Sequence, residues 1–374
     1  LSVTNQSGRH VLLGHLSRLA AWSGRQHCYT VLYHAGNADL VRDLGPNVTW
    51  QACPARTAGW FLRAGWERLF LPALARRERA GCVFSPAGVA VPGLGCRQVV
   101  LCQNPWSLVP ALRRGPGGEA KAFLQRRAYR AAMRLADVMV FNSHYMHEAY
   151  RRNAGFDCRR PVVAYQGINE GTFADAGRLG NQVARDALRI LSVSAMARHK
   201  DVETLLRALV LVRQRFAVPA RLDLVGAWPD PAYRTEMESL CHALGLDDAV
   251  SFRGHVSAEE LHRCYAAAQV FCLMSRCESF GIPAVEAQCF GTPVVSSNCC
   301  AIPEVCGEGG VYPDPGDPLR TAEGLTRLLS DGSYWQRLSR LASANTQRFR
   351  WDVCSRPLFD AFCSLSEEAC GQPA

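Results

Sequence analysis

The feature that most constrains the fold of this 374-residue chain is a repeated alternation of short apolar runs with longer amphipathic segments. Runs such as QVVLCQN (98–104) and DVMVFNS (137–143) predict strands, and the segments between such runs carry apolar residues at helical spacing. Strands that alternate with helices indicate βαβ units and parallel sheets. The length is sufficient for two domains with separate cores.

The apolar runs fall into two series, which predict two domains. The stretch between the series, GINEGTFADAGRLGNQ (167–182), is polar and rich in glycine. We therefore expect an α/β protein with one domain over residues 1–167, a linker, and a second domain over residues 182–350. A further helix is expected at about 352–368. The opening LSVTNQSG is interpreted as the end of a first strand whose start lies before the chain.

The segment SRCESFGIPAVEAQCFGTPVVSS (275–297) carries the most information about function. A strand and a loop are expected first, followed by a helix that starts near Pro283, because proline suits the first position of a helix. The backbone N–H groups of Phe280, Gly281 and Ile282 would then lie at the positive end of that helix. Such an end binds anions, and a diphosphate fits it.

Two carboxylates, Glu278 and Glu286, flank this turn. A loop and the start of a helix separate the two glutamates, so their side chains can face one crevice from different positions. Carboxylates accept hydrogen bonds from the hydroxyl groups of a ribose or of a sugar. The alternative is that one glutamate caps the helix and the other is solvated.

The segment ESFGIPAVE (278–286) resembles the E-x7-E signature of retaining nucleotide-sugar glycosyltransferases of the fourth family, which have the GT-B fold. SVSAMARHKDVETLLRAL (192–209) and the run from VSFRGHV (250–256) onwards are similar to the same family in the same order. The resemblance implies two Rossmann-like domains that face each other across a cleft, with the final helix returning to the first. It also implies sugar transfer from a nucleotide diphosphate to a hydroxyl group, with retention, in polysaccharide or cell-envelope glycan synthesis.

The resemblance also implies roles for single residues. Lys200 stands where the family's lysine contacts the diphosphate, Glu286 where a glutamate binds the ribose, and Glu278 where a glutamate lies near the transferred sugar. Lys200 and Glu278 are the predicted catalytic residues. The other residues implied to bind the donor are Ser279, Phe280, Gly281, Ile282, Arg253 and Gly254 in the second half, and Ser7, Gly8, Gln103 and Asn104 in the first.

The chain departs from the family pattern at two places. Ala195 stands where relatives often have a second arginine for the diphosphate, and the nearby Arg198 is expected to point elsewhere. Gln103 and Asn104 stand where many relatives have a histidine. These departures keep open a catalytically silent scaffold of the same fold. A nucleotide-sugar epimerase of the same fold is a second alternative, although it lacks a separate acceptor and should not need a basic first domain.

No metal or cofactor is expected in the site. The 17 cysteines are scattered without a CxxC pair, which is typical of buried free thiols rather than of a metal centre. His144 and His147 can approach each other on a helix, but no acidic residue or third ligand accompanies them in the sequence. The nucleotide sugar is therefore treated as a substrate.

Charge is concentrated in the first half, where residues 1–165 hold 22 Lys and Arg against 8 Asp and Glu. The basic and aromatic stretch 59–81 predicts a helix that either faces the core or contacts an anionic membrane, and 113–130 adds a second basic run. No recognised nucleic-acid module accompanies the charge. No apolar run approaches the ~20 residues of a membrane span. We expect a cytoplasmic protein that acts on a glycan or lipid-linked acceptor, with peripheral contact to the inner face of a membrane as a further hypothesis.

Overall fold

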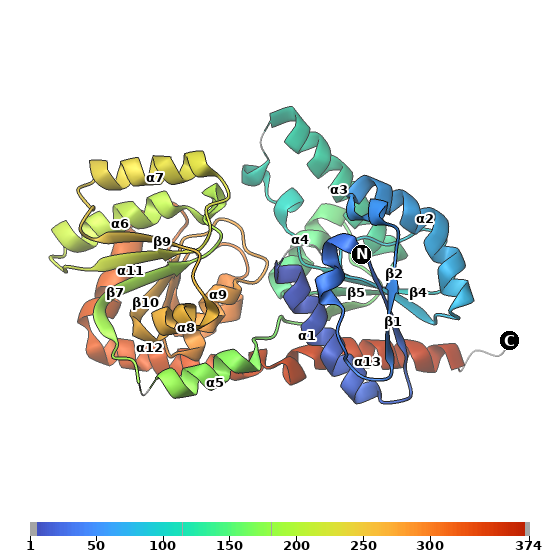
Figure 1. Cartoon of the computed structure of the whole chain (residues 1–374). Helices are drawn as coiled ribbons and strands as arrows, with labels where there is room; N and C mark the ends of the chain where they lie inside the picture. Colours follow the sequence, from blue (N-terminus) through green and yellow to red (C-terminus); the bar gives the residue numbers. More distant parts are fainter. Residues whose placement is uncertain (1–5, 114, 181, 371–374) are drawn as a thin grey trace. The chain divides into compact units, whose positions relative to one another are not determined.

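The computed structural model describes residues 6–113, 115–180 and 182–370 and divides the chain into two compact units (Figure 1). Unit 1 contains the described residues up to Gly167 together with those from Trp351 onwards, and unit 2 contains Ile168–Arg350. The strands in each unit are parallel, so the predicted α/β class with two Rossmann-like domains is confirmed.

Unit 1 is built on a parallel sheet of order β3-β4-β5-β6 and a separate parallel pair, β1-β2. Apolar residues at helical spacing and β-branched runs account for the alternation of these elements. Its helices and strands are α1 (Gln6–Ser23), β1 (Tyr29–Tyr33), β2 (Val48–Ala52), α2 (Trp60–Arg77), β3 (Cys82–Ser85), β4 (Arg97–Cys102), α3 (Gly115–Leu135), β5 (Val138–Phe141), α4 (His144–Ala154), β6 (Pro161–Val163) and α13 (Trp351–Cys370).

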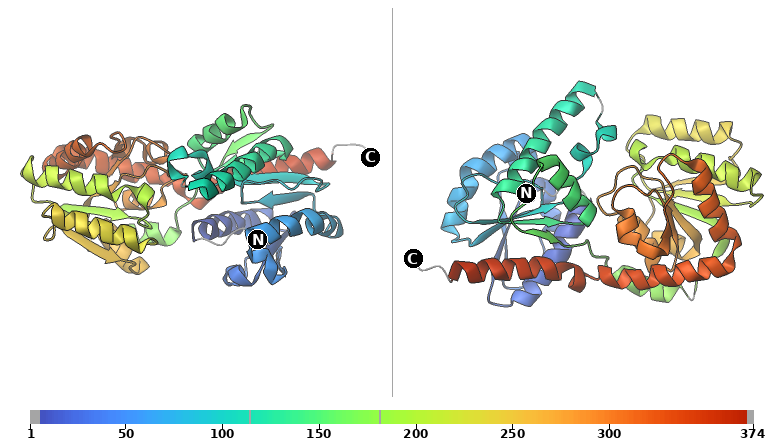
Figure 2. Two further views of the ribbon diagram at one scale, coloured as in Figure 1. Left: turned by 90° about the horizontal axis from the view of Figure 1, so that it is seen from above. Right: turned by 180° about the vertical axis from the view of Figure 1, so that it is seen from behind.

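Unit 2 is built on a six-stranded parallel sheet of order β12-β11-β10-β7-β8-β9, and helices cover both faces of this sheet (Figure 2). Its elements are α5 (Glu170–Leu179), β7 (Asp186–Val193), α6 (Val202–Gln214), β8 (Arg221–Val225), α7 (Pro231–Ala243), β9 (Val250–Gly254), α8 (Ala258–Ala267), β10 (Ala268–Leu273), α9 (Ile282–Cys289), β11 (Val294–Ser296), α10 (Ile302–Cys306), β12 (Gly310–Val311), α11 (Pro318–Ser330) and α12 (Gly332–Asn345).

Short 3₁₀ turns complete the two units. They are η1 (Ala35–Leu40), η2 (Ala55–Ala58), η3 (Trp106–Leu108), η4 (Pro110–Leu112), η5 (Arg198–Lys200), η6 (Gly307–Gly309) and η7 (Thr346–Phe349).

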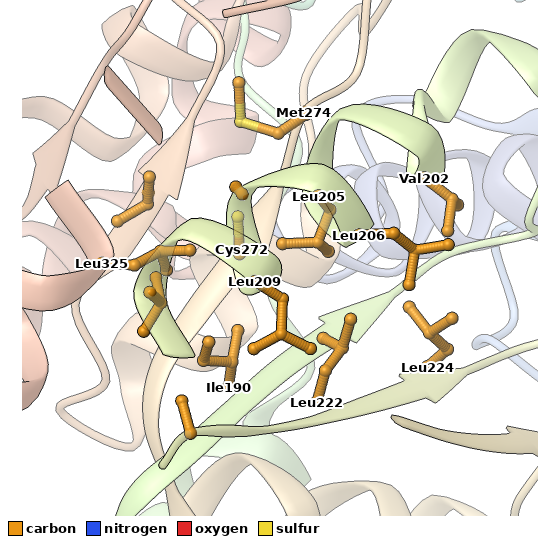
Figure 3. Packing of buried hydrophobic residues seen from close by; sticks show 14 of the residues in the cluster. Ile190, Val202, Leu205, Leu206, Leu209, Leu222, Leu224, Cys272, Met274 and Leu325 are labelled. Carbon is orange, nitrogen blue, oxygen red and sulfur yellow. The ribbon is translucent and has the colours of Figure 1, made fainter. Parts of the chain in front are cut away.

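The core of unit 2 lies between the sheet and helices α6 and α11. Leu205, Leu206 and Leu209 of α6 are almost fully buried and pack with Ile190 of β7 and Leu325 of α11 (Figure 3). Spacings of three and four residues place these leucines on one stripe of the helix. Burial of this stripe fixes α6 on the sheet, and the chain enters α6 from the turn that carries Lys200.

Helix α13 belongs to the core of unit 1. Its Leu358, Ala361 and Leu365 are buried with residues of α1 and of strands β4 and β5. At its start, the Trp351 indole packs so closely on two glycines that a Cβ atom added to Gly14 would lie 2.1 Å from it, and one added to Gly167 would lie 2.3 Å from it. Only glycine is compatible with this contact.

The structure contradicts one sequence-based expectation and part of another. The segment expected to be a linker contains helix α5, because Thr172 and Leu179 are buried and the guanidinium of Arg350 stacks on the Phe173 ring at 4.4 Å. The first-strand interpretation of LSVTNQSG lies outside the described residues for 1–5, and residues 6–8 form the first turn of α1.

Candidate functional site

The loops at the carboxyl ends of two neighbouring strands, β7 and β10, form the site. The strands pair in parallel, with Ile190 opposite Val270 and Leu191 opposite Phe271. Their carboxyl ends therefore meet at the same edge of the sheet. This edge is where open parallel sheets bind their ligands.

Lys200 and Glu278, which the resemblance to the family placed in the site, are in direct contact. The Lys200 ammonium donates a hydrogen bond to the Glu278 carboxylate, and only 13% and 16% of the two side chains are exposed. An ammonium has three N–H donors. Besides its bond to Glu278, Lys200 therefore has N–H groups with which an anionic ligand can be bound.

The turn that carries Lys200 is held from the opposite loop. The Arg276 backbone N–H donates to the His199 carbonyl at 2.8 Å, and the Ser275 hydroxyl donates to the same oxygen at 3.3 Å. The Arg276 side chain donates to the Asp201 carboxylate at 2.9 Å. Asp201 caps α6 with a φ of 53°, a left-handed conformation that is strained for most residues other than glycine. These contacts fix the position of the lysine.

The turn before α9 has the geometry that the sequence predicted. Gly281 has a φ of 94° and precedes the helix, which starts at Ile282. A Cβ at Gly281 would lie 2.9 Å from Ile302 Cγ1, so glycine is required both for conformation and for space. Phe280 is buried and packs edge-on against Phe349 at 5.5 Å. Its contribution to ligand binding is therefore restricted to its backbone.

Glu286 lies one turn into α9. The Tyr265 hydroxyl donates to its Oε2 at 3.1 Å, and burial raises the pKa of the Glu286 carboxyl above its ordinary value. The structure connects Glu286 to α8 through Tyr265, whereas it connects Glu278 to Lys200. A half-buried carboxylate with one hydrogen-bond donor keeps lone pairs that can accept from hydroxyl groups.

The remaining predicted residues of unit 2 are placed with α8 or beside the loop of Glu278. The Arg253 guanidinium donates to Glu260 and lies 3.0 Å from the Cys264 sulfur, so its charge is engaged by α8. Gly254 ends β9 with a φ of 67°. Ser279 is half-buried between Glu278 and Phe280.

The predicted residues of unit 1 occupy an element start and a strand end. Ser7 and Gly8 lie in the first turn of α1. Gln103 and Asn104 follow β4. The Gln103 amide donates to the Pro86 carbonyl at 3.3 Å, and the Asn104 side chain accepts from the Trp106 N–H at 3.0 Å.

Sequence reasoning missed three features of the site. Arg276, beside the Lys200 turn, is half exposed and is a candidate for the cation that Ala195 does not provide. Tyr265 orients Glu286. Cys300 has a φ of 63° in the loop where the N–H of the next residue, Ala301, donates to the Glu278 carbonyl at 3.2 Å. No motif marked these residues, because their roles depend on contacts between distant loops.

Arg198 points away from this edge, as expected. It bonds to Glu236 at 2.6 Å and lies over the Tyr233 ring at 4.9 Å, both in α7. The expectation that His147 lacks an acidic neighbour was wrong. Asp157 and Cys158 approach it, because the chain reverses at Gly155 after α4.

Residues 180–347 match the family described as glycosyl transferases group 1. The chain is 30% identical over 245 residues to a D-inositol 3-phosphate glycosyltransferase of Xylanimonas cellulosilytica, with 62% of this chain and 58% of the relative covered. It is 29% identical to the O-antigen chain mannosyltransferase B of Escherichia coli over 46% of this chain and 45% of that protein. The matches thus span about half the length of these relatives, 58% of the first and 45% of the second.

Two solved structures show the same fold over nearly the whole chain. HepE of Anabaena, in complex with UDP-glucose, has a TM-score of 0.72 and 19% identity and covers 97% of this chain and 98% of its own. A glycosyltransferase of Rickettsia africae has a TM-score of 0.74 and 14% identity, with 97% of both chains covered. Residues 180–347 of this chain are thus similar to the glycosyl transferases group 1 family, and its two parallel-sheet units have the GT-B fold.

Proposed function

We propose that the protein is a retaining glycosyltransferase that moves a sugar from a nucleotide diphosphate to a hydroxyl acceptor. The observation that carries the proposal is the contact of Lys200 with Glu278 beside the Gly281 turn, inside the family match. The nucleotide sugar bound by HepE and the transferase names of the relatives support the same class of donor.

The leaving diphosphate gains negative charge as the bond to the anomeric carbon breaks. Fixed positive groups placed where that charge develops lower the barrier most. Lys200 provides one such group, and the N–H groups at the start of α9 provide a second. Arg276, held by Asp201, provides a third. With these groups in place we expect transfer without an added metal.

The two glutamates divide the donor between them in this proposal. Glu286, oriented by Tyr265, accepts hydrogen bonds from the ribose. Glu278 lies beside the transferred sugar, where its negative charge stabilises the positive charge that grows on the anomeric carbon.

Retention follows if the acceptor attacks the face that the diphosphate leaves. The bond from the anomeric carbon to the phosphate oxygen breaks, and a bond from that carbon to the acceptor oxygen forms. The proton of the acceptor hydroxyl passes to the departing phosphate oxygen. This route requires no separate protein base, which is consistent with Gln103 and Asn104 at the position where relatives have a histidine.

The test is slow donor hydrolysis, with water as the acceptor. The full chain is incubated with UDP-, GDP- and ADP-sugars, with and without a chelator, and the anomer of the released sugar is followed by NMR. We expect one nucleotide to be preferred and the sugar to be released as the α-anomer. Release as the β-anomer would falsify retention. Tight binding without release would indicate a silent scaffold, and a changed sugar still on the nucleotide would indicate an epimerase.

We also propose that α2 docks the protein on the inner face of an anionic membrane, close to a lipid-linked acceptor. Five large apolar side chains of this helix, here named the α2 patch, are exposed: Trp60 (62%), Phe61 (73%), Leu62 (56%), Leu69 (73%) and Phe70 (50%). The core-facing alternative is therefore wrong for these residues. Exposed arginines at 76 and 77 end the same helix, which suits anionic lipid.

None of the described helices is long and apolar enough to span a bilayer. Docking by α2 would therefore be peripheral, and its strength would depend on surface charge.

Flotation with vesicles tests the docking. Binding should require acidic lipid and weaken with salt. Replacing Arg76, Arg77 and Arg79 by Gln should weaken binding by roughly 100-fold, at about 1 kcal/mol for each basic residue. A triple Gln variant at Arg207, Arg263 and Arg320, exposed arginines of unit 2, is the matched control. Equal binding of the two triple variants would contradict the proposal.

A further inference from the structure

Three side chains with different ligand atoms meet in unit 1, far in sequence from the donor site. Among the residues that the structure describes, His147, Asp157 and Cys158 are the one group of three whose potential ligand atoms all lie within 4.8 Å of one another. They supply one nitrogen, one oxygen and one sulfur. We name this group the His147 cluster.

The local fold produces the His147 cluster. Ser143 caps α4 by accepting from the Met146 N–H at 3.2 Å, so His147 lies at the end of the first turn. Gly155 ends the helix with a φ of 78°, a left-handed conformation that suits glycine, and the chain turns back. Asp157 Oδ1 then lies 2.8 Å from His147 Nε2 and also accepts from the Cys158 N–H at 2.8 Å.

Burial arranges the three ligands in depth. Cys158 is 7% exposed and packs with the core of unit 1. The side chains of His147 and Asp157 are 22% and 46% exposed. The Phe141 ring lies 4.8 Å from the imidazole and restricts its rotation. The thiol thus forms the buried end of the cluster, and the carboxylate forms its exposed end.

The arginines near the cluster in sequence are paired with carboxylates. Arg159 lies 3.9 Å from Asp137, and Arg160 donates to Glu368 at 2.5 Å. Arg151 and Arg152 of α4 both donate to Glu148 at 2.7 Å. Their positive charges are thereby offset by a carboxylate on the same helix. The Asp157 carboxylate contributes a further negative charge at the exposed end of the cluster.

We propose that the His147 cluster binds a borderline divalent cation, Zn²⁺, with three protein ligands and water in the fourth position. Imidazole, carboxylate and thiolate are the ligands that zinc prefers, at bond lengths of about 2.0–2.3 Å, which place tetrahedral ligands about 3.5 Å apart. The three ligand atoms lie within 4.8 Å of one another, with His147 Nε2 and Asp157 Oδ1 2.8 Å apart, so binding would require these two atoms to separate. On binding, the Cys158 sulfur–metal bond forms and the thiol proton passes to water.

The zinc proposal does not rest on the proposed sugar transfer. Zinc would link the first turn of α4 to the loop before β6, and a cation that binds only the folded chain stabilises it. Failure of the zinc proposal would therefore leave the proposed activity untouched.

The experiment uses the full chain, reduced and stripped of metal. Co²⁺, a spectroscopic substitute for Zn²⁺, should give a near-ultraviolet band from thiolate-to-cobalt charge transfer and visible bands of tetrahedral geometry. Equilibrium dialysis with Zn²⁺ should show one equivalent more for the parent than for Cys158→Ser or His147→Gln. His262→Gln is the matched control, because His262 pairs with Asp175 at the same 2.8 Å and no third ligand atom joins that pair among the described residues.

A second variant separates loss of metal from loss of folding. Asp157→Asn keeps the shape of the side chain, so its circular dichroism should match that of the parent. Zn²⁺ should raise the melting temperature of the parent and of His262→Gln, and leave that of Asp157→Asn unchanged. Equal zinc binding by all four variants, or cobalt spectra without a thiolate band, would overturn the proposal.

Discussion

Helices α2 and α6 are both rich in apolar residues, yet only α6 buries them. Leu205, Leu206 and Leu209 of α6 are at most 2% exposed, whereas Phe61 and Leu69 of α2 are each 73% exposed. In α6 the apolar residues form one stripe, and the arginines lie outside it. In α2 the arginines alternate with aromatic residues around the helix, and its buried residues are Leu71 and Ala75. Segregation of the two kinds of side chain, rather than apolar content, separates a core helix from a docking helix.

The two regions also differ in how charge is held. Lys200, at the entrance to α6, is enclosed with Glu278. Arg76, at the end of α2, is exposed, and Arg77 is 66% exposed and donates to Glu78 at 2.8 Å. A fixed charge suits stabilisation of a transition state, because no reorganisation is needed as the reaction proceeds. An exposed charge is accessible to the head groups of an anionic lipid surface.

The contrast in burial predicts the largest difference in stability. Leu206→Ala in α6 should lower the free energy of unfolding by about 2–5 kcal/mol, because it leaves a cavity in the core. Leu69→Ala in α2 should change it by no more than about 0.5 kcal/mol. Urea unfolding of the full chain measures both. Similar losses would show that the α2 patch is covered in solution.

Removal of the enclosed charge should have the next largest effect. Lys200→Ala should lower turnover by roughly 10²–10³-fold, which is the usual cost of losing one preorganised group at a developing negative charge. Arg198→Ala is the matched control, since Arg198 is directed to α7. Turnover of Lys200→Ala within a few-fold of the parent would remove Lys200 from the site.

The two glutamates should separate binding from rate. Glu278→Gln should lower kcat by about tenfold or more, because its interaction strengthens in the transition state. Glu286→Gln should mainly raise the donor KM, since hydrogen bonds to the ribose are the same in both states. Steady-state kinetics at several donor concentrations distinguish the two. An interchange of the effects would leave the family assignment in place and reverse the roles.

The contribution of Glu286 to the free energy of unfolding should depend on pH. Burial raises the pKa of its carboxyl above the ordinary 4.5, so the folded chain holds this proton more tightly than the unfolded chain does. Between 4.5 and the raised pKa this group makes the fold less stable as pH rises, and above that range its cost is constant. Glu286→Gln should remove this loss and be more stable than the parent at pH 7. Denaturant titrations of both proteins at pH 4.5 and pH 7 check the sign.

The sequence predicted the parts of the fold and site that depend on local order. The alternation of runs identified parallel sheets, and Pro283 placed the start of α9 within one residue. The resemblance of ESFGIPAVE and of the segment around Lys200 to one family predicted that Glu278 and Lys200 share a site. The structure shows the two side chains in contact.

Features set by distant contacts could not be predicted. Helix α5 was missed because its glycines suggested a loop, whereas Phe173 is held by Arg350 from the other end of the unit. The metal-ligand cluster depends on the reversal at Gly155, and His147 alone gave no indication of Asp157. The contact of the Arg253 guanidinium with Glu260 was not predicted either. The positions of charged residues in the sequence do not indicate which of them form ion pairs in the fold.

The smallest predicted effect compares two strained residues, one in each region. Arg79, after α2, has a φ of 51°, and Cys300, in the loop beside Glu278, has a φ of 63°. A left-handed conformation costs an ordinary residue about 1–2 kcal/mol, and glycine relieves this at an entropic cost of about 0.5–1 kcal/mol. Arg79→Gly and Cys300→Gly should therefore each stabilise the fold by about 0.5–1 kcal/mol in urea unfolding. Cys300→Ala, which keeps the strain, is the control and should give no gain.

Only the Cys300 substitution should reach the donor, because the N–H of Ala301 donates to the Glu278 carbonyl at 3.2 Å and a more flexible loop holds Glu278 less firmly. Because Glu278 acts on the transition state, we expect kcat to fall by about twofold in Cys300→Gly and to remain unchanged in Arg79→Gly. The pKa of Cys299, lowered mainly by its hydrogen bond with Cys300, should return toward its usual range in Cys300→Gly, and the pH profile of thiol alkylation reports this. A change in kcat in Arg79→Gly would show that the region of α2 is coupled to the site, and would contradict the contrast between a tolerant surface and a constrained loop.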